Sequence, residues 1–352
     1  MLQVRFISAV ILPWLHSASS FTATSSLRHI ISSNTISTTS TIHQTVHDRT
    51  TALNAIPPPH NNNELHLLTF DLDDTIFPIG PVVADANVAQ LRTLIQYGYE
   101  NAANEEIIAA SKQIRTELRE TGSAITYSDL RKQSIRREIE RVTGLSGSTS
   151  DEAVHGSVIE AVFDAWLSER HASADRNLYP FASNALQTIR EEHPGAVIGA
   201  ITNGRGNPLE MPSMKEYFDF CISGEDDGVF PRRKPDKGIY EAAVRKYNEI
   251  IMQGQGTISS QESGENGLNW IHVGDDLAND VGASAACGAK SIWFTMKEEE
   301  DGVEAELPSW STATEEELRK RATLDEMARE YVSAKIVSLE ELPGAIVDVL
   351  SW

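Results

Sequence analysis

The apolar residues of this chain fall into short unbroken runs, and between the runs they recur at the three- and four-residue spacing of amphipathic helices. Short runs that do not alternate with polar residues are typical of strands buried on both faces of a parallel sheet. The pattern predicts strands at residues 65–70, 196–201, 219–223, 269–273 and 291–295. It predicts helices at residues 181–192, 236–248, 278–287 and 339–350. Strands that alternate with helices indicate an α/β fold with a doubly wound parallel sheet.

A long stretch between the first two predicted strands has almost no strand signal. Helical spacing covers most of it, in segments at 84–98, 104–120, 127–143 and 151–171. A simple strand–helix–strand crossover needs far fewer residues. We therefore interpret residues 84–177 as an inserted all-helical cap, and residues 64–83 and 178–352 as the core. Residues 253–267 are expected to form a surface loop, and residues 297–317 an exposed acidic extension.

The first part of the chain has a different composition. Arg5 and an apolar run up to Leu15 precede small residues, which predicts a signal peptide over residues 1–20. Residues 21–63 are rich in Ser and Thr and nearly free of acids, which is typical of a transit peptide. Together they resemble the bipartite plastid-targeting leaders of algae and predict a plastid location, with an ordinary secretory leader as the alternative.

The formal net charge of −21 and a pI near 4.9 change the range of expected partners. No block of Lys and Arg interrupts this acidity, which argues against sequence-independent binding of nucleic acid. No later segment is long and apolar enough to suggest a membrane span. The two cysteines, Cys221 and Cys287, do not make a disulfide framework. A small anionic substrate is compatible with this composition, because a metal and a few local cations can outweigh the global field.

Two carboxylates lie two residues apart where the first predicted strand ends, in the segment Asp71-Leu72-Asp73-Asp74-Thr75. Open α/β folds bind their ligands at this edge of the sheet. An ionised carboxylate can attack phosphorus without a base, and a second carboxyl can protonate the leaving alkoxide and then take a proton from water. The segment predicts Asp71 as a nucleophile, Asp73 as an acid and base, and a metal between them and a phosphate.

Two further polar segments follow later in the chain. Thr202, Asn203 and Gly204 end the second predicted strand, where a hydroxyl and backbone N–H groups can cradle phosphate oxygens. Lys234 precedes Pro235, which we expect to open a helix at its first position. The ammonium group of Lys234 would then reach the phosphate and the nucleophile as a point charge.

A last acidic segment follows the fourth predicted strand. Mg²⁺ prefers oxygen ligands and needs only one or two protein carboxylates besides the substrate phosphate, so Asp275 is the expected additional ligand. Asp280, one helical turn further on, is expected to hold Lys234 or a metal-bound water. Asp276 has two interpretations, since it can help to bind the metal or cap the helix.

With these four motifs, around Asp71, Thr202, Lys234 and Asp275, the chain resembles the haloacid dehalogenase superfamily. The resemblance implies a Rossmann-like core, a helical C1 cap and Mg²⁺ dependence. It implies that the carboxylates of Asp71 and Asp275 and the main-chain carbonyl of Asp73 hold the metal, with Thr75, Asp276 and Asp280 in support. In this superfamily an acid at the position of Asp73 separates phosphatases and phosphomutases from dehalogenases.

The same motifs are similar to those of bacterial phosphatases that hydrolyse 5-amino-6-(5-phospho-D-ribitylamino)uracil and FMN. This likeness implies a Mg²⁺-dependent phosphomonoester hydrolase of the riboflavin pathway that works through an aspartyl-phosphate. A sugar phosphomutase with the same motifs is an alternative, and a catalytically idle scaffold protein is another. The oligomeric state stays open.

Some residues of the expected cap are candidates for contacts with a ring or a second anionic group of the substrate. They are Tyr127, Arg131, Arg137, Trp166 and Arg170. Residues 76–83, with Pro78, Gly80 and Pro81, are expected to form a turn beside the site. His272, Trp270, Trp293 and Cys287 are interpreted as packing residues.

Overall fold

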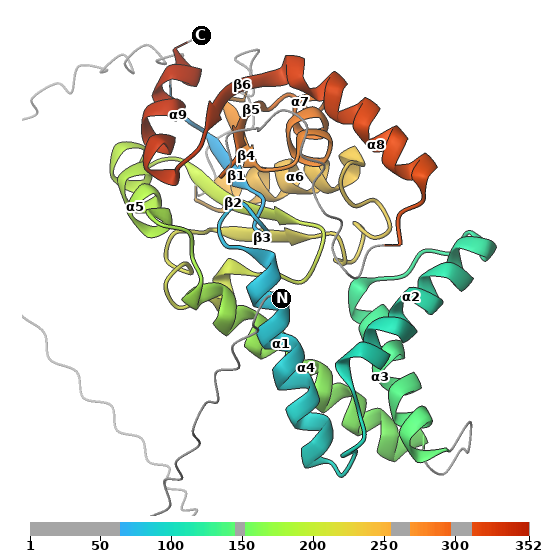
Figure 1. The fold of residues 1–352 in the computed structure, drawn as a ribbon. Helices are drawn as coiled ribbons and strands as arrows, with labels where there is room; N and C mark the ends of the chain where they lie inside the picture. The colour runs from blue at the N-terminus through green and yellow to red at the C-terminus, as the bar shows by residue number, and fades with distance from the viewer. Residues whose placement is uncertain (1–63, 145–151, 255–267, 297–311, 352) are drawn as a thin grey trace, which may run out of the picture. The chain divides into compact units, whose positions relative to one another are not determined.

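The computed structural model describes residues 64–144, 152–254, 268–296 and 312–351. The predicted leader lies outside these residues, as do most of the predicted loop at 253–267 and residues 297–311 of the predicted extension. The described part is built on a six-stranded parallel sheet with the order β3-β2-β1-β4-β5-β6 (Figure 1). The predicted α/β class with a parallel sheet is confirmed.

Five of the six strands are the predicted ones, with small shifts of their ends. The strands are β1 (Leu67–Phe70), β2 (Val197–Thr202), β3 (Phe220–Ser223), β4 (Trp270–Gly274), β5 (Lys290–Phe294) and β6 (Val332–Ile336). The sequence pattern missed β6 because this strand lies at the edge of the sheet and most of its side chains are only partly buried. It therefore lacks the continuous apolar run that marks the inner strands.

Helices cover both faces of the sheet, which explains why the inner strands do not alternate. In β1 every residue is buried, and successive side chains point to opposite faces. Leu68 packs in the cluster that contains α5 (Ala182–Glu192) and α9 (Leu342–Leu350). Leu67 packs in the cluster that contains α6 (Lys237–Gly254). Both faces of the strand therefore require apolar residues.

The first four of the five helices between β1 and β2 project from one end of the sheet (Figure 1). They are α1 (Ile79–Gln96), α2 (Asn104–Thr121), α3 (Tyr127–Thr143) and α4 (Glu152–Arg176). Apolar residues from all four form a separate buried cluster, which includes Leu94, Ile107, Ile135 and Val162. The helical insert thus has its own core, at the place in the chain where the sequence predicts one.

The turn predicted for residues 76–83 is wrong beyond its first residues. Helix α1 begins at Ile79, Pro78 is its N-cap, and Gly80 and Pro81 lie in its first turn. The first turn of a helix has backbone N–H groups without intrahelical acceptors, so it tolerates a proline that lacks one. Glycine and proline, which usually break helices, therefore lie at the start of one here.

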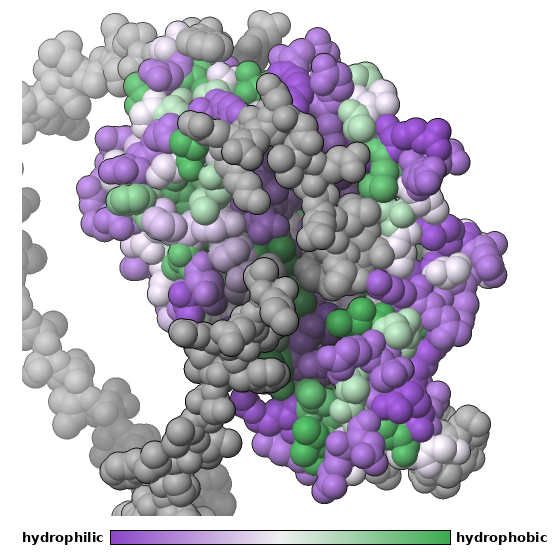
Figure 2. Space-filling model, in the orientation of Figure 1, coloured by the Kyte–Doolittle hydropathy of each residue, from purple (hydrophilic) through white to green (hydrophobic). Residues whose placement is uncertain are grey.

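Helix α8 (Glu315–Ala328) was not predicted, because the sequence shows no apolar stripe there. Thr314 and Glu317 form a capping box at its start, which stabilises the first turn. The end of the predicted acidic extension is therefore the start of a helix. Hydrophilic residues predominate along α8 and α2 on the face seen in Figure 2.

Shorter turns complete the described chain. They are η1 (Pro208–Glu210), the π-helical turn η2 (Leu277–Gly282), α7 (Ala283–Ala285), η3 (Arg329–Tyr331) and η4 (Leu339–Glu341). The helix predicted at 278–287 is therefore η2 followed by α7, and that at 339–350 is η4 followed by α9. Among the described residues, no helix combines the length and the apolar character that crossing a bilayer requires.

Candidate active site

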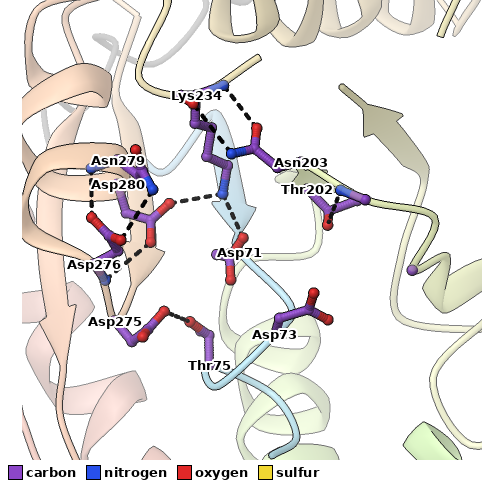
Figure 3. A network of polar contacts seen from close by, with 12 residues as sticks. Asp71, Asp73, Thr75, Thr202, Asn203, Lys234, Asp275, Asp276, Asn279 and Asp280 are labelled. Carbon is purple, nitrogen blue, oxygen red and sulfur yellow. Dashed lines mark hydrogen bonds and ion pairs between the residues drawn. The ribbon is translucent and has the colours of Figure 1, made fainter. Parts of the chain in front are cut away.

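The predicted site residues meet at the carboxyl edge of three neighbouring strands. Asp71 follows β1, Thr202 ends β2 and Asp275 follows β4. Because β1 pairs in parallel with β2 on one side and β4 on the other, these three strand ends lie side by side. Figure 3 shows their side chains around Lys234. The structure therefore brings the four sequence motifs together.

Lys234 is the centre of the buried charges. Its Nζ donates to Oδ1 of Asp71 at 2.5 Å and to Oδ1 of Asp280 at 2.7 Å, and only 2% of its side chain is exposed. Burial lowers the pKa of Lys234, but Asp280 and Asp71 together raise it by a larger amount, so the net shift is upward. The lysine is therefore charged at neutral pH. The contact with Asp280 is one of the two that the sequence predicted for that residue.

Asn203 fixes the position of Lys234. Its side chain accepts a hydrogen bond from the backbone N–H of Lys234 at 2.8 Å and donates to the backbone carbonyl of the same residue at 3.2 Å (Figure 3). The expectation that Pro235 opens a helix is wrong, because α6 begins only at Lys237. Pro235 lies in a turn instead, which a hydrogen bond from the N–H of Asp236 to the carbonyl of Arg233 closes. The lysine is thus held by the residue that follows β2 rather than by a helix terminus.

Asp280 is held from two sides. His272 of β4 lies with Nε2 3.4 Å from Oδ1 of Asp280, and its Nδ1 lies 2.8 Å from Oγ1 of Thr69. Burial raises the pKa of Asp280, but Lys234 and His272 lower it more, to about 2. Asp280 is therefore ionised. The interpretation of His272 as a packed strand residue is confirmed, since it is fully buried, but no sequence pattern indicated its contact with Asp280.

The last residue of β4 is Gly274, and the side chain of Asp280 packs so closely against it that no larger residue fits. A side-chain carbon at this position would lie 2.4 Å from the carboxyl carbon of Asp280. Trp270 and Trp293 are buried, as predicted, and both donate their indole N–H groups: Trp270 to Thr69 Oγ1, and Trp293 to the carbonyl of Asp275. The tryptophans of β4 and β5 thus brace β1 and the residue that follows β4.

Asp275 and Asp276 have different environments. Asp275 accepts a hydrogen bond from Oγ1 of Thr75 at 3.3 Å, which agrees with a supporting role for Thr75. Burial raises the pKa of Asp275 well above its usual range, and Asp280 and Asp71 add to the shift. Asp276 accepts a hydrogen bond from the N–H of Asn279 at 2.6 Å and so caps η2. Asp276 also pairs with Arg321 of α8, a partner that no local sequence pattern indicated.

Three carboxylates have the arrangement of a metal site. One oxygen each from Asp71, Asp275 and Asp280 lie within 4.8 Å of one another. Burial raises the pKa of Asp71 well above its usual range against the effect of Lys234, and Asp280 and Asp73 add to the shift. Such crowding of buried carboxylates is relieved by a divalent cation, and oxygen ligands suit Mg²⁺. Asp71 and Asp275 fit a magnesium ion, because Lys234 bonds to Oδ1 of Asp71 and not to its Oδ2. Both oxygens of Asp280 accept hydrogen bonds, Oδ1 from Lys234 and Oδ2 from the N–H of Asp276.

Asp73 lies apart from these carboxylates. In Figure 3 its side chain points away from Asp275. Nη2 of Arg170, on α4, donates to both oxygens of Asp73, at 2.7 and 3.0 Å. Arg170 was a candidate for substrate contact, but its pairing with Asp73 was not foreseen, because the two residues are 97 positions apart. The insert therefore touches the core at the residue predicted to carry protons.

A pocket of about 580 Å³ extends from Asp73, Asn203 and Gly204 to the helical insert. Of the predicted contact residues, four line it: Tyr127, Arg131, Trp166 and Arg170. Arg137 does not, because it pairs with Glu117 on the surface of the insert. Asn87, Arg115 and Arg119 also line the pocket, although they were not among the predicted contacts. Their helical spacing alone does not distinguish them from solvent-exposed residues.

The fold and this cluster of acids around a lysine point to one class of hydrolase. A family model described as haloacid dehalogenase-like hydrolase matches residues 65–288. The chain belongs to the haloacid dehalogenase-like hydrolase family. The matched residues include Asp71, Thr202, Lys234 and Asp280, so the resemblance inferred from the motifs is confirmed.

Two curated relatives are phosphatases by description. The chain is 28% identical over 232 residues to the 5-amino-6-(5-phospho-D-ribitylamino)uracil phosphatase YigB of Escherichia coli, a match that covers 64% of this chain and 82% of the relative. It is 24% identical over 241 residues to the ribulose-1,5-bisphosphate 5-phosphatase of Halopiger xanaduensis, over 67% of this chain and 87% of the relative.

A solved structure supports the fold. The 2-haloacid dehalogenase from Pseudomonas syringae pv. Tomato DC3000 has a TM-score of 0.53 and 20% sequence identity, and the match covers 80% of this chain and 98% of that chain. At this identity the likeness concerns the architecture alone.

Proposed function

We propose that this protein is a phosphatase that hydrolyses a phosphomonoester of a small metabolite through an aspartyl-phosphate. The observation that carries the proposal is the position of Lys234, whose ammonium group lies between Asp71 and Asp280 at the carboxyl edge of the sheet. Family membership and the two phosphatase relatives support the same reaction. An acid at position 73 is what a phosphoester requires, because its leaving alkoxide must be protonated.

The first half-reaction transfers the phosphoryl group to the protein. An oxygen of Asp71 forms a bond to phosphorus while the bond from phosphorus to the ester oxygen breaks. Asp73 gives its proton to that oxygen, and the alcohol leaves. Lys234 and the backbone N–H groups that follow Thr202 offset the negative charge on the phosphoryl oxygens.

In the second half-reaction water attacks the phosphorus of the aspartyl-phosphate. Asp73, now ionised, takes the proton of the water, and the bond from phosphorus to Asp71 breaks to give inorganic phosphate and the free carboxylate. In the structure Arg170 occupies both oxygens of Asp73. The arriving substrate must therefore displace this ion pair before an oxygen of Asp73 can contact the ester oxygen.

Mg²⁺ is the metal that we propose for this site. The carboxylates of Asp71 and Asp275 would hold it, and the main-chain carbonyl of Asp73 is the further ligand that the resemblance implies. When bound, the ion supplies charge neutralisation for the phosphoryl oxygens. The raised pKa values of Asp71 and Asp275 support this choice, because both carboxylates are crowded by other acids.

The riboflavin pathway is our candidate for the cellular role. It rests on the similarity to the E. coli enzyme, whose described substrate is 5-amino-6-(5-phospho-D-ribitylamino)uracil, and FMN is a second candidate substrate. A plastid location is proposed from the leader sequence alone. The competing function is a sugar phosphomutase, which returns the phosphoryl group to the substrate instead of to water.

The test is phosphate release with Mg²⁺ across a panel of FMN, the ribitylaminouracil phosphate, sugar monophosphates, sugar bisphosphates and nucleotides. Free phosphate in excess of isomerised sugar phosphate supports the phosphatase over the mutase. Asp71→Asn should abolish turnover while the circular dichroism spectrum stays unchanged. A purified Asp71→Asn protein that releases phosphate at the wild-type rate would show that Asp71 is not the nucleophile.

A further inference from the structure

The pocket above the site has more positive charge than its acids balance. Its charged lining consists of Arg115, Arg119, Arg131, Arg170 and Arg205 with two acids, Asp73 and Glu317. Both acids already have partners, because Asp73 pairs with Arg170 and Glu317 pairs with Arg119. Among the described residues, no carboxylate forms an ion pair with Arg115 or Arg131. In a chain with a net charge of −21, this local excess of cations needs an explanation.

Arg131 is the best-defined of these cations. Its guanidinium carbon lies 3.9 Å from the centre of the Trp166 ring, and Nη1 donates to Oδ1 of Asn87 at 3.1 Å and to Oε1 of Gln90 at 3.0 Å. Trp166 donates to the same Asn87 oxygen at 3.1 Å. Burial lowers the pKa of Arg131 to about 9, and Arg170 contributes to this shift. Neutral partners hold this guanidinium in place without balancing its charge.

Arg170 and Arg115 each have a buried donor that is unused. Only 3% of Arg170 is exposed, and Nη1 has no hydrogen-bond acceptor among the described residues, although Nη2 bonds to Asp73. The Nε of Arg115 is also buried without an acceptor in the described chain. A buried donor without an acceptor destabilises the structure, because it has lost its hydrogen bonds to water. An anion in the pocket would satisfy such donors and balance the charge.

The aromatic rings of the pocket are already covered by cations. Arg131 lies over Trp166, and Arg233 and Arg115 lie 4.5 and 5.6 Å from the centre of the Tyr127 ring. A flat substrate ring would have to displace these guanidinium groups before it could stack. The pocket therefore favours an anionic group over an uncharged ring at this place.

We propose that the substrate carries a second anionic group, a phosphate or a carboxylate, which binds to Arg131, Arg170 and Arg115 while its phosphomonoester lies at Asp71. The inference rests on the proposed function and narrows its substrate class to doubly anionic metabolites. It therefore disfavours the two riboflavin-pathway candidates, because FMN and the ribitylaminouracil phosphate carry one phosphate and no second phosphate or carboxylate. An anion that engages Arg170 also competes with Asp73 for that guanidinium. The same contact would then free Asp73 for proton transfer, so the second anion assists the reaction as well as binding.

Two matched pairs of substrates test the inference with the full-length protein and Mg²⁺. Fructose 6-phosphate and fructose 1,6-bisphosphate differ by a phosphate, and glucose 6-phosphate and 6-phosphogluconate differ by a carboxylate. Initial rates of phosphate release give kcat/KM for each. We expect the doubly anionic member of at least one pair to be preferred by about tenfold or more, because hydrogen bonds between charged groups are worth more than neutral ones. The pair that shows the preference identifies the anion.

Variants assign the preference to the arginines. Arg131→Gln and Arg115→Gln should each lose about tenfold more kcat/KM on the doubly anionic substrate than on its partner. Arg137→Gln is the matched control, because Arg137 lies on the same helix as Arg131, pairs with Glu117 and does not line the pocket. The control should keep the wild-type preference. If Arg131→Gln fails to give a folded circular dichroism spectrum, Arg115→Gln decides, since its side chain is only half-buried.

Three other results overturn the inference in distinguishable ways. Hydrolysis of all four sugars without a preference, or a preference that both variants keep, refutes the anion site and leaves the phosphatase function intact. No phosphate release from these sugars or from p-nitrophenyl phosphate refutes the proposed function and the inference together.

Discussion

The ammonium group of Lys234 lies 2.5 Å from a carboxylate oxygen of Asp71, although the two residues are 163 positions apart in the sequence. Asp280 shares the same ammonium, and all three side chains are shielded from water. The parallel pairing of β1 with β4 brings the two acids together, and Asn203 brings the lysine to them. The contact between the nucleophile and its cation is thus part of the folded structure before any substrate arrives.

Replacement of Lys234 by Met should destabilise the metal-free protein by about 3–5 kcal/mol, because it leaves Asp71 and Asp280 buried without their cation. Urea unfolding in EDTA measures this change. Lys237→Met is the control, since Lys237 is exposed and its ion pair is with Glu241, 3.7 Å away. Equal free energies of unfolding for the two variants would show that the buried pairing contributes nothing to stability.

The metal-free protein should lose stability as the pH rises from the acidic range. Burial raises the pKa of Asp275 and of Asp71 well above the usual value of 3.8. Above 3.8 and up to the folded-state pKa, the folded protein binds more protons than the unfolded chain, so its stability falls with rising pH through this window. Mg²⁺ should restore the stability at neutral pH, because it binds the folded state.

Asp275→Asn tests the same relationship by removing one charge. We expect this variant to have a higher Tm than the wild type in EDTA at neutral pH and a much smaller gain in Tm when Mg²⁺ is added. Thermal unfolding with and without Mg²⁺ measures both quantities. Glu340→Gln, which changes an exposed acid of η4, should behave like the wild type. A Tm for Asp275→Asn that is below the wild type in EDTA would contradict the idea of crowded carboxylates.

Asp73→Asn should lower kcat/KM much more for some substrates than for others. An alkyl phosphomonoester needs protonation of its leaving oxygen, whereas the nitrophenolate of p-nitrophenyl phosphate leaves without it. General acid catalysis contributes about 10²–10⁴-fold, and we expect the loss of kcat/KM on the alkyl ester to exceed the loss on the aryl ester by a factor in this range. Asp71→Asn, which lacks the attacking group, should lose activity on both esters. Equal losses of kcat/KM on the two esters would show that Asp73 is not the general acid.

The inner sheet and the catalytic motifs could be predicted from the sequence, because both depend on local patterns. A strand such as β4 is a continuous apolar run, and an acid that directly follows it must lie at the carboxyl edge. For this reason the positions of Asp71, Thr202 and Asp275 along the chain are enough to predict that they lie together. The turn that carries Lys234 was predicted wrongly, because a proline before a helical pattern resembles a helix start.

Contacts between distant segments could not be predicted from one sequence. The pairing of Arg170 with Asp73 depends on how α4 lies over the core, and the contact of Arg321 with Asp276 depends on how α8 packs against η2. Neither arginine differs in local pattern from a solvated residue on a helix. Helix α8 itself has no apolar stripe, so its place against η2 is visible only in the folded chain.

Arg321 provides the last prediction, which concerns the support of the metal site by α8. It pairs with Asp276, next to the proposed ligand Asp275, and Asp325 of the same helix accepts from the N–H of Ala278 at 3.0 Å. Arg321→Gln should raise the Mg²⁺ concentration for half-maximal activity by about tenfold, because residues behind metal ligands typically affect affinity by this much. Arg319→Gln is the control, since Arg319 is exposed and its ion pair is with Glu315 of its own helix. Identical Mg²⁺ activation curves for the two variants would mean that α8 covers the site without supporting it.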